Sequence, residues 1–284
     1  MLFLNIDSVK YPMNKKLISL DNLKFSKYSC CDCKSSFIFT DDKLVCTYCR
    51  SIFDVDGGIP IFDKTNLNKS SGLASNLFEF PWLYNFFVLL KNKIYKDKFL
   101  NIKKYTNDRS VLNVGCGPNV NAPYLEYDLK KVKSFYALDL SYNFVKQASD
   151  QNLFSMSNFS VASVYKLPFK NNTFDVVLLP FVLHHLPDHL DKALQECLRV
   201  SKKYVIIFDH VVSDNKFIAF LQNLYWNLFD GGFNYLTNSE WNKLLANCSI
   251  KKSLNTGLIF KHVYKILLEK VPKSPKTINT NNSF

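Results

Sequence analysis

From Ser110 onward, short apolar segments alternate with longer amphipathic segments, and this alternation restricts the possible fold more than any other feature. Short apolar runs between turn residues are typical of buried strands, and longer segments with an apolar stripe are typical of helices. Strands are expected at 110–114, 134–139, 158–162, 174–179 and 203–209, and helices at 121–131, 142–151 and 187–200. This order predicts right-handed βαβ crossovers, and therefore an α/β domain whose parallel sheet has helices on both faces.

The C-terminal part departs from this alternation. Thr237 and Glu240 have the spacing of a capping box, which predicts a short helix after Thr237. Two strand-like runs then follow, Ser249 to Leu254 and Leu258 to Leu268, with Asn255-Thr-Gly257 between them. An Asn and a Gly between two apolar runs favour a tight turn. We therefore expect a hairpin that ends the sheet with antiparallel strands.

The strand expected at 110–114 is followed by Gly115 and Gly117, two glycines separated by a single residue. Glycine suits positions where the backbone needs a positive φ, or where a ligand approaches too closely for a Cβ atom. In open parallel sheets such a loop binds nucleotide-like cofactors, although an ordinary strand-to-helix turn can have the same sequence. Asp139 lies 22 residues after Gly117 and closes the next strand, where a carboxylate can accept hydrogen bonds from ribose hydroxyls.

A cluster of cysteines precedes this region. Cys30 and Cys33 form one C-x-x-C pair, Cys46 and Cys49 form a second, and twelve residues separate the two. Four thiolates at this spacing favour a closed tetrahedral Zn²⁺ site, which is structural because it leaves no open ligand position. Cys31 is an extra thiol, so a pair of Cys31 with Cys33 is an alternative. The stretch resembles the small zinc ribbon that is found at the front of some methyltransferases and as the separate activating partner of others.

Two further strand ends carry characteristic motifs. One reads Ala162-Ser-Val-Tyr-Lys-Leu-Pro-Phe169 with Phe-Asp five residues later, and the other reads Pro180-Phe-Val-Leu-His-His-Leu-Pro-Asp188. Together with the glycine loop and Asp139, these motifs resemble the class I methyltransferases of the type 11 kind, which use S-adenosylmethionine. The resemblance covers about Ser110 to Asp209. It implies a Rossmann-like, seven-stranded, mostly parallel sheet with an antiparallel C-terminal hairpin, preceded by a zinc-ribbon module.

The resemblance also implies a site for the methyl donor, S-adenosylmethionine. Gly115 and Gly117 would line its methionine end, Asp139 would hold its ribose, and Ser163 with Val164 would flank its adenine. The full set of donor-binding residues expected in this way is Asn113, Gly115, Cys116, Gly117, Asp139, Leu140, Ser163, Val164 and Pro180.

Three positions depart from the family pattern. Asn113 stands where the family usually has an acid, Asn119 replaces a third glycine, and Ser163 replaces an aspartate that accepts from the adenine amino group. Asn tolerates the left-handed backbone region better than most residues. Each lost charged acceptor is expected to weaken its hydrogen bond by about 1 kcal/mol.

Methyl transfer displaces a neutral sulfide from a sulfonium, so the enzyme mainly positions two reactants. A base is needed only when the acceptor is a hydroxyl or a carbon acid. His184, His185 and His210 lie at strand ends, and we expect His185 to be the catalytic base. Residues 214–233 add an aromatic helix and are the expected substrate lid, with Gly231-Gly232 as its hinge.

The net charge of +12 suits an anionic partner, although a lysine-rich surface explains it equally well. The chain has only three arginines, whereas nucleic-acid readers usually depend on arginine. A small-molecule or lipid-like acceptor is therefore favoured. The alternative is an rRNA or tRNA acceptor, and the ribbon would then contact RNA. A non-catalytic binding module that uses the ribbon as a docking surface for a protein partner is the rival from another class.

The chain is expected to divide into a zinc-ribbon module (1–62), a linker with aromatic and basic helices (63–107), a methyltransferase domain (108–270) and a disordered tail (271–284). A run of about 18 apolar residues, as a membrane span requires, is not visible. The N-terminal segment also lacks the basic flank and apolar run of a signal peptide. A cytoplasmic location follows as the default expectation, and it agrees with reading the cysteine cluster as a metal site.

Overall fold

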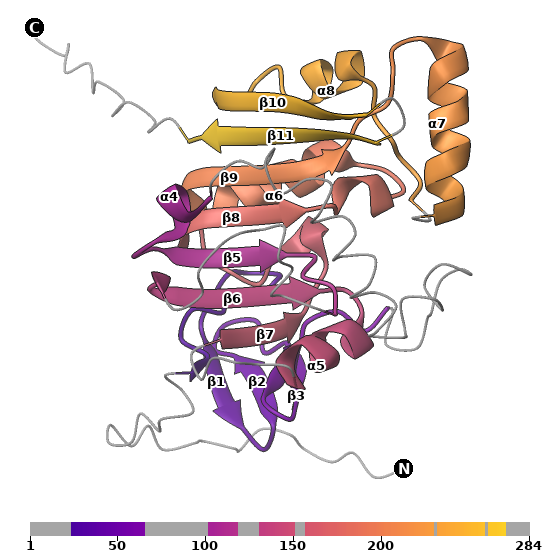
Figure 1. Cartoon of the computed structure of the whole chain (residues 1–284). Coiled ribbons are helices and arrows are strands. Elements are labelled where there is room, and N and C mark those ends of the chain that lie inside the picture. Colours follow the sequence, from indigo (N-terminus) through magenta and orange to yellow (C-terminus); the bar gives the residue numbers. More distant parts are fainter. Residues whose placement is uncertain are drawn as a thin grey trace, which may run out of the picture.

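The computed structural model describes residues 24–65, 102–118, 131–150, 157–229, 232–258 and 261–270. Within these ranges a single mixed sheet of eleven strands runs through the molecule (Figure 1), in the order β1-β2-β3-β4-β7-β6-β5-β8-β9-β11-β10. Its last seven strands have the order that doubly wound sheets produce, because the first strand along the chain, β5, lies in the middle.

The parallel strands lie where the apolar runs predict them. Strands β5, β6, β7, β8 and β9 pair in parallel, and their bounds are Ser110–Val114, Ser134–Asp139, Ser157–Val161, Phe174–Pro180 and Ser201–His210. Every residue of β5 is buried, as a strand covered on both faces requires. The seven-stranded, mostly parallel sheet is therefore confirmed.

The sheet ends in an antiparallel hairpin, β10 (Ile250–Leu258) and β11 (Lys261–Glu269), and β11 pairs with β9. The expected position of the turn is wrong. Asn255 and Gly257 lie inside β10, opposite Tyr264 and His262. The strands pair as far as Leu258 and Lys261, because continuing the ladder satisfies more backbone groups than an early turn would.

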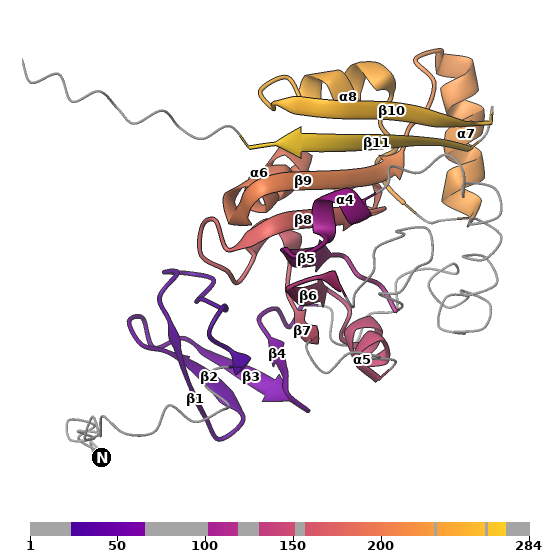
Figure 2. The ribbon, with the colours of Figure 1, turned by 60° about the vertical axis from the view of Figure 1, so that its left-hand side comes forward.

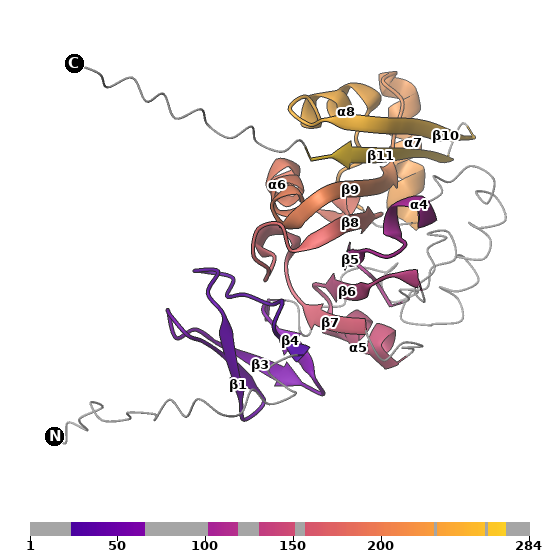
Figure 3. The ribbon, with the colours of Figure 1, turned by 90° about the vertical axis from the view of Figure 1, so that its left-hand side faces the viewer.

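Helices cover both faces of the sheet. Figures 2 and 3 show α4 (Lys103–Thr106) and α5 (Tyr142–Asp150) on one face and α6 (Leu190–Val200) on the other. Helix α6 begins later than expected because His189 has a left-handed backbone, with φ of 49°. The helix expected at 121–131 lies almost wholly outside the described residues. None of the helices in the described ranges is long and apolar enough to cross a membrane.

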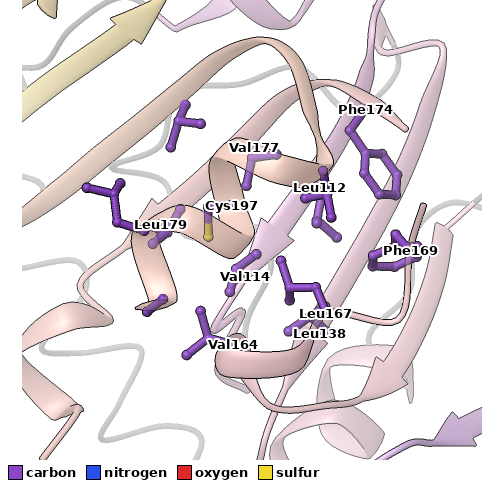
Figure 4. Packing of buried hydrophobic residues seen from close by; sticks show 14 of the residues in the cluster. Leu112, Val114, Leu138, Val164, Leu167, Phe169, Phe174, Val177, Leu179 and Cys197 are labelled. Carbon is purple, nitrogen blue, oxygen red and sulfur yellow. The ribbon is translucent and has the colours of Figure 1, made fainter. Parts of the chain in front are cut away.

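Two apolar layers sandwich the central strands. Leu112 and Val114 of β5 pack toward α6 and its Cys197, whereas Val111 packs toward α5 on the opposite face. Figure 4 shows the first layer, in which Leu167 and Phe169 lie beside the same strands. This alternation follows from the two-residue period of a strand, and it fixes the register of β5 between its neighbours.

The cysteine-bearing segment forms a ribbon of short strands. These are β1 (Phe37–Thr40), β2 (Lys43–Cys46), β3 (Ile52–Asp56) and β4 (Ile59–Ile61), paired antiparallel in sequence order. Asp41 and Asp42 make the first turn with φ values of 48° and 54°, which is the backbone of a tight two-residue hairpin. A tight hairpin therefore joins β1 to β2.

The ribbon continues the main sheet. Strand β4 pairs in parallel with β7 at Ile61 and Val161, and Phe62 N donates to Val161 O at 2.8 Å. Figures 2 and 3 show the ribbon at the β7 end, inclined toward the face that carries α6. Tyr28, 2% exposed, belongs to the same apolar cluster as Leu112. The sheet and this apolar cluster therefore include residues from both the ribbon and the strands that follow it.

The expected linker and aromatic segment fall mostly on 66–101, and the expected tail on 271–284, outside the described residues. Helix α8 (Asn238–Leu244) begins at the predicted capping box. The Thr237 side chain accepts from Glu240 N at 3.2 Å, and Glu240 Oε2 accepts from Thr237 N at 2.8 Å. Its Trp241 is buried and its indole N–H donates to His210 O, so the cap also places this helix against β9.

Candidate functional site

Four neighbouring parallel strands end at one edge of the sheet. In the order β7, β6, β5 and β8 they end at Val161, Asp139, Val114 and Pro180. The loops that follow them carry the residues expected to bind the methyl donor. A crevice outside the carboxyl ends of the strands, beside the point where the strand order reverses, is where open α/β sheets bind ligands.

The glycine loop after β5 is fastened to the end of β6. The backbone N–H groups of Gly115 and Cys116 both donate to Leu138 O, at 2.8 and 3.0 Å. Gly115 and Gly117 have φ values of 69° and 58°, so both positions need glycine. A Cβ atom at position 115 would also collide with Cγ2 of Val182, which follows β8. Position 115 is therefore restricted to glycine both by its backbone and by its packing against Val182.

The carboxylate of Asp139 organises two loops. Its Oδ2 accepts from Gly117 N and its Oδ1 accepts from Ser141 N, each at 3.0 Å. Desolvation raises the pKa of this carboxyl, and the backbone N–H groups of Ser141 and Gly117 oppose that rise. The backbone N–H of Leu140 also bonds to this carboxyl. A carboxylate offers about four acceptor positions in all, so acceptor capacity remains for a ligand hydroxyl. The carboxylate thus both holds the glycine loop and remains able to accept.

Asn113 has a buried side chain at the centre of this region. The residue is 1% exposed, and neither Oδ1 nor Nδ2 of its amide has a hydrogen-bond partner among the described residues. An unsatisfied buried amide costs about 1–3 kcal/mol, which a polar group of a ligand would recover. The amide therefore fits a site that holds a polar ligand, although it lacks the charge of the expected acid.

The other residues expected to bind the methyl donor lie at the same edge. Ala162 N donates to Asp139 O at 3.0 Å, and this bond holds the loop after β7 against the loop after β6, which includes Leu140. Ser163 caps the single 3₁₀ turn η4 (Val164–Lys166), and its Oγ accepts from Tyr165 N at 3.3 Å. Pro180 pairs with Phe208 at the end of β8. Burial raises the pKa of the Cys116 thiol, which is therefore neutral.

A buried histidine–aspartate pair lies next to this edge. His184 is in the 3₁₀ turn η5 (Leu183–His185), and its Nδ1 lies 2.5 Å from Oδ1 of Asp209 at the end of β9. Both side chains are 1% exposed. Leu183 N also donates to Asp209 Oδ2, and His210 N donates to Oδ1. Burial alone would raise the pKa of Asp209, but the charge and hydrogen bond of His184, together with His210, hold that pKa below its usual value, so Asp209 is a carboxylate.

His185, the expected catalytic base, lies beside this pair at the surface. It is exposed, whereas His184 is buried, and their ring centroids are 4.0 Å apart. The backbone of η5 holds it, because His185 N donates to Val182 O at 3.0 Å. The structure therefore gives the two histidines different environments. His185 is accessible to an acceptor, and the role predicted for it stays a prediction.

Aromatic side chains from the expected lid and from the residues just after it pack against two buried histidines, His210 and His184. Helix α7 (Lys216–Phe229) supplies Trp226, whose ring centroid lies 3.8 Å from that of His210. Tyr235 stacks on His184 at 5.4 Å with an interplanar angle of 17°. Gly232 N donates to the Tyr235 hydroxyl, and a Cβ atom there would lie 2.6 Å from Cδ2 of His184. Gly232 thus permits close packing, while the hinge expected at 231–232 is untested and Gly231 lies outside the described residues.

The four cysteines expected to bind metal converge on one point. The Sγ atoms of Cys30, Cys33, Cys46 and Cys49 all lie within 4.8 Å of one another, and three of the pairs are 3.4–3.5 Å apart. Thiolates around a tetrahedral Zn²⁺ at about 2.3 Å lie roughly 3.8 Å apart, so this geometry fits a closed zinc site. Cys31 is outside the group and buried, with a pKa raised to about 12 by that burial. Among the described residues, the alternative pair of Cys31 with Cys33 is not formed.

This arrangement predicts different effects for two neighbouring cysteines. Cys46→Ser is expected to lower bound zinc from about one ion per chain toward none, because a tetrahedral site loses one of its ligands. Cys31→Ser, the matched control, should keep full zinc. Elemental analysis of the purified variants measures both. Full zinc in Cys46→Ser, or its loss in Cys31→Ser, would show that the ligand set is wrong.

Some residues of the site escaped sequence reasoning. The pairing of Asp209 with His184, the contact of Val182 with Gly115, and the positions of Trp226 and Tyr235 were not anticipated. A usable signal existed for Asp209 alone. It ends the strand that follows the histidine turn, and neighbouring parallel strands place their carboxyl ends together.

Comparison with known proteins agrees with this geometry. Residues 112–208 match a family described as "Methyltransferase domain". Relatives include the ubiquinone/menaquinone biosynthesis C-methyltransferases UbiE of Rickettsia felis and Rickettsia rickettsii, 30% and 29% identical over 153 residues. These matches cover 50% of this chain and 61% of each relative, so the chain spans about three fifths of the length of the curated relatives it matches.

Solved structures share the fold. A protein described as a methyltransferase from Bacillus halodurans has a TM-score of 0.50 and 15% identity, covering 59% of this chain and 95% of that one. A chain from the complex between the Haloferax volcanii Trm112 methyltransferase activator and a protein assigned as a methyltransferase has a TM-score of 0.51 and 12% identity. That match covers 68% of this chain and 97% of the other. The segment from β5 to β9, which carries the glycine loop, Asp139 and the paired histidines, is thus the part of the chain that is similar to methyltransferase domains.

Proposed function

We propose that this protein is an enzyme that transfers a methyl group from S-adenosylmethionine to a small, lipid-like acceptor. The observation that carries the proposal is the joining of Asp139 to the glycine loop through Gly117 N, beside the unsatisfied amide of Asn113. A polar ligand with hydroxyls would satisfy both groups. The donor, when bound, supplies an activated methyl group on a positively charged sulfur.

The residues of the chain act by positioning. The free acceptor positions of the Asp139 carboxylate would receive the ribose hydroxyls, while Gly115 and Gly117 let the methionine end approach the backbone. Ser163 and Val164 would flank the adenine. Because Asn113 and Ser163 lack the charge of the family's acids, donor affinity is expected to be lower than in relatives that have them. Four cysteines would hold a structural Zn²⁺.

Two observations favour a small acceptor. Trp226 and Tyr235 place aromatic rings around the histidine turn, where they suit an apolar molecule. The UbiE relatives carry the name of enzymes of ubiquinone and menaquinone biosynthesis. By contrast, Arg199 donates to Glu196 and to backbone carbonyls, and Arg109 donates to Tyr105 O. Two of the three arginines are therefore engaged within the fold and are unsuited to reading RNA.

The donor part of this proposal is tested by calorimetry with S-adenosylmethionine and S-adenosylhomocysteine. We expect saturable binding with one ligand per chain. No detectable heat at high micromolar ligand would refute the enzyme and favour a non-catalytic module. The acceptor part is tested by incubating the enzyme and radioactive donor with a cell extract. Label in the solvent-extractable fraction supports a lipid-like acceptor, and label in RNA, with salt-dependent RNA binding, would overturn it.

The histidine turn supplies a separate prediction. His185→Ala is expected to lower the initial rate of label incorporation by about 100-fold, since general-base catalysis contributes about 10²–10⁴-fold. Donor affinity should stay unchanged. His189→Asn is the matched control, because His189 is an exposed histidine with a left-handed backbone that Asn tolerates. Equal rates in His185→Ala and His189→Asn would show that His185 is not the general base.

A further inference from the structure

The first C-x-x-C turn touches the loop that is expected to flank the adenine. We define the knuckle as residues 29–35, and the donor loop as residues 162–169. Ser29 N donates to Pro168 O at 2.9 Å, and Lys34 Nζ donates to Leu167 O at 3.2 Å. Asp32 and Lys166 form an ion pair at 2.5 Å. A cysteine-bearing turn and a cofactor loop, more than 100 residues apart in sequence, are therefore bonded directly.

Packing strengthens this junction. Tyr28, next to the knuckle, stacks on Phe169 with centroids 5.1 Å apart and an interplanar angle of 26°. It also lies 5.4 Å from Phe62 of the ribbon and 5.6 Å from Tyr136 of β6. Both Tyr28 and Phe169 are buried. The end of the donor loop is thus enclosed by aromatic rings from the ribbon and from the main sheet.

The opposite side of the donor loop is held by helix α6. Arg199 donates to Leu167 O at 3.1 Å and to Phe169 O at 2.6 Å, and Glu196 accepts from Leu167 N at 2.8 Å. Leu167 O therefore receives one bond from Arg199 and one from Lys34. The donor loop is therefore hydrogen-bonded on one side to the knuckle and on the other side to α6.

The knuckle keeps its shape through the cysteines. Lys34 has a left-handed backbone, with φ of 61°, and its N–H donates to Cys30 O at 2.9 Å. Cys30 N in turn donates to Ser35 O. For a lysine this backbone is unfavourable by roughly 1–2 kcal/mol, so other interactions must hold the turn. The convergence of four thiolates on one metal ion is such an interaction.

We infer that Asp32 and Lys34 are positioning residues for the donor loop, and that metal binding at the four cysteines and donor binding assist each other. This inference rests on the proposed function. Metal holds the knuckle, the knuckle holds the carbonyl groups of Leu167 and Pro168, and the loop they belong to presents Ser163 and Val164 to the adenine. Linkage is reciprocal, so the donor must strengthen metal binding by the same factor by which the metal strengthens donor binding.

The test measures both affinities on the full chain. Calorimetry with S-adenosylhomocysteine is done on the zinc-loaded protein and after removal of zinc by a chelator, and we expect binding to weaken by about tenfold or more. In reverse, competition with a zinc-binding dye should show zinc affinity rising by the same factor when S-adenosylhomocysteine saturates the protein. Equal donor affinity with and without zinc would overturn the inference and leave the proposed function standing.

A substitution avoids the risk that zinc removal unfolds the ribbon. Lys34→Met keeps the length of the side chain and all four cysteines, and it removes the bond to Leu167 O. We expect full zinc content with weaker donor binding and faster amide hydrogen exchange in residues 162–169. Lys43→Met, at an exposed position on β2, is the matched control and should change neither. If neither Lys34→Met nor zinc removal changes amide exchange in the donor loop, the knuckle does not hold that loop and the inference is refuted. This outcome is informative even if no donor binds and the proposed function fails.

Discussion

Gly115→Ala is expected to lower the free energy of unfolding by about 2–5 kcal/mol and to abolish measurable donor binding. A left-handed backbone costs a residue with a Cβ atom roughly 1–2 kcal/mol, and forcing an extra methyl group into packed surroundings costs about 1–3 kcal/mol. Both apply here, because Gly115 has φ of 69° and its Cβ atom would collide with Val182. Urea unfolding measures the first effect and calorimetry with S-adenosylhomocysteine the second.

The collision and the backbone strain can be separated. In the double variant Gly115→Ala with Val182→Ala, the space beside Cγ2 of Val182 is free, so only the strain of the backbone should remain. We expect the double variant to lose less stability than the sum of the two single variants, as residues in direct contact do. Additive losses would mean that Val182 does not limit the size of residue 115.

Replacing Asp139 by alanine is expected to weaken donor binding by about 100-fold while the chain stays folded. Two contributions add. The ribose hydroxyls lose a charged acceptor, and a hydrogen bond to a charged group typically contributes about 1.5–3 kcal/mol. The backbone N–H groups of Gly117 and Ser141 also lose the carboxylate to which they donate. The loop that receives the methionine end is then free to move. Calorimetry measures the affinity, and circular dichroism verifies the fold.

Asp175 provides the control for this result. It lies at the start of β8, at the opposite edge of the sheet, and its Oδ2 accepts from Ser110 N and from the Ser110 hydroxyl at 2.9 and 2.7 Å. Asp175→Ala removes a carboxylate that also caps backbone, so it should reduce stability without changing donor affinity. If Asp139→Ala bound the donor as tightly as Asp175→Ala does, the ribose would have to lie elsewhere.

The sequence predicts the strands of the sheet well, because β5, β6 and β8 are mostly buried on both faces and appear as largely apolar runs. The same holds for Asp139, since a carboxylate at a strand end is visible without any tertiary information. The turn of the final hairpin was misplaced for a related reason. Asn255 and Gly257 are compatible with a turn, but the pairing of β10 with β11 decides where the chain reverses.

The histidine turn shows what sequence reasoning could not reach. Nothing local distinguishes His184 from His185, and only the fold shows that one is buried against Asp209 while the other is exposed. The ribbon junction was out of reach for the same reason. Its decisive contacts join Lys34 to Leu167 and Ile61 to Val161, pairs separated by at least 100 residues. Such contacts depend on tertiary geometry, which no periodicity in the sequence encodes.

The pairing of β4 with β7 has a consequence for how the protein can be divided. Without β4, β7 would be an edge strand with unpaired backbone N–H and C=O groups on its outer side. Exposed edge strands of this kind promote aggregation. Withdrawing the ribbon would also bare the ring of Phe169 against which Tyr28 is stacked. The strands from β5 onward therefore depend on the ribbon at this side of the sheet. Because the ribbon covers the backbone of β7 and the ring of Phe169, removing it is expected to promote aggregation.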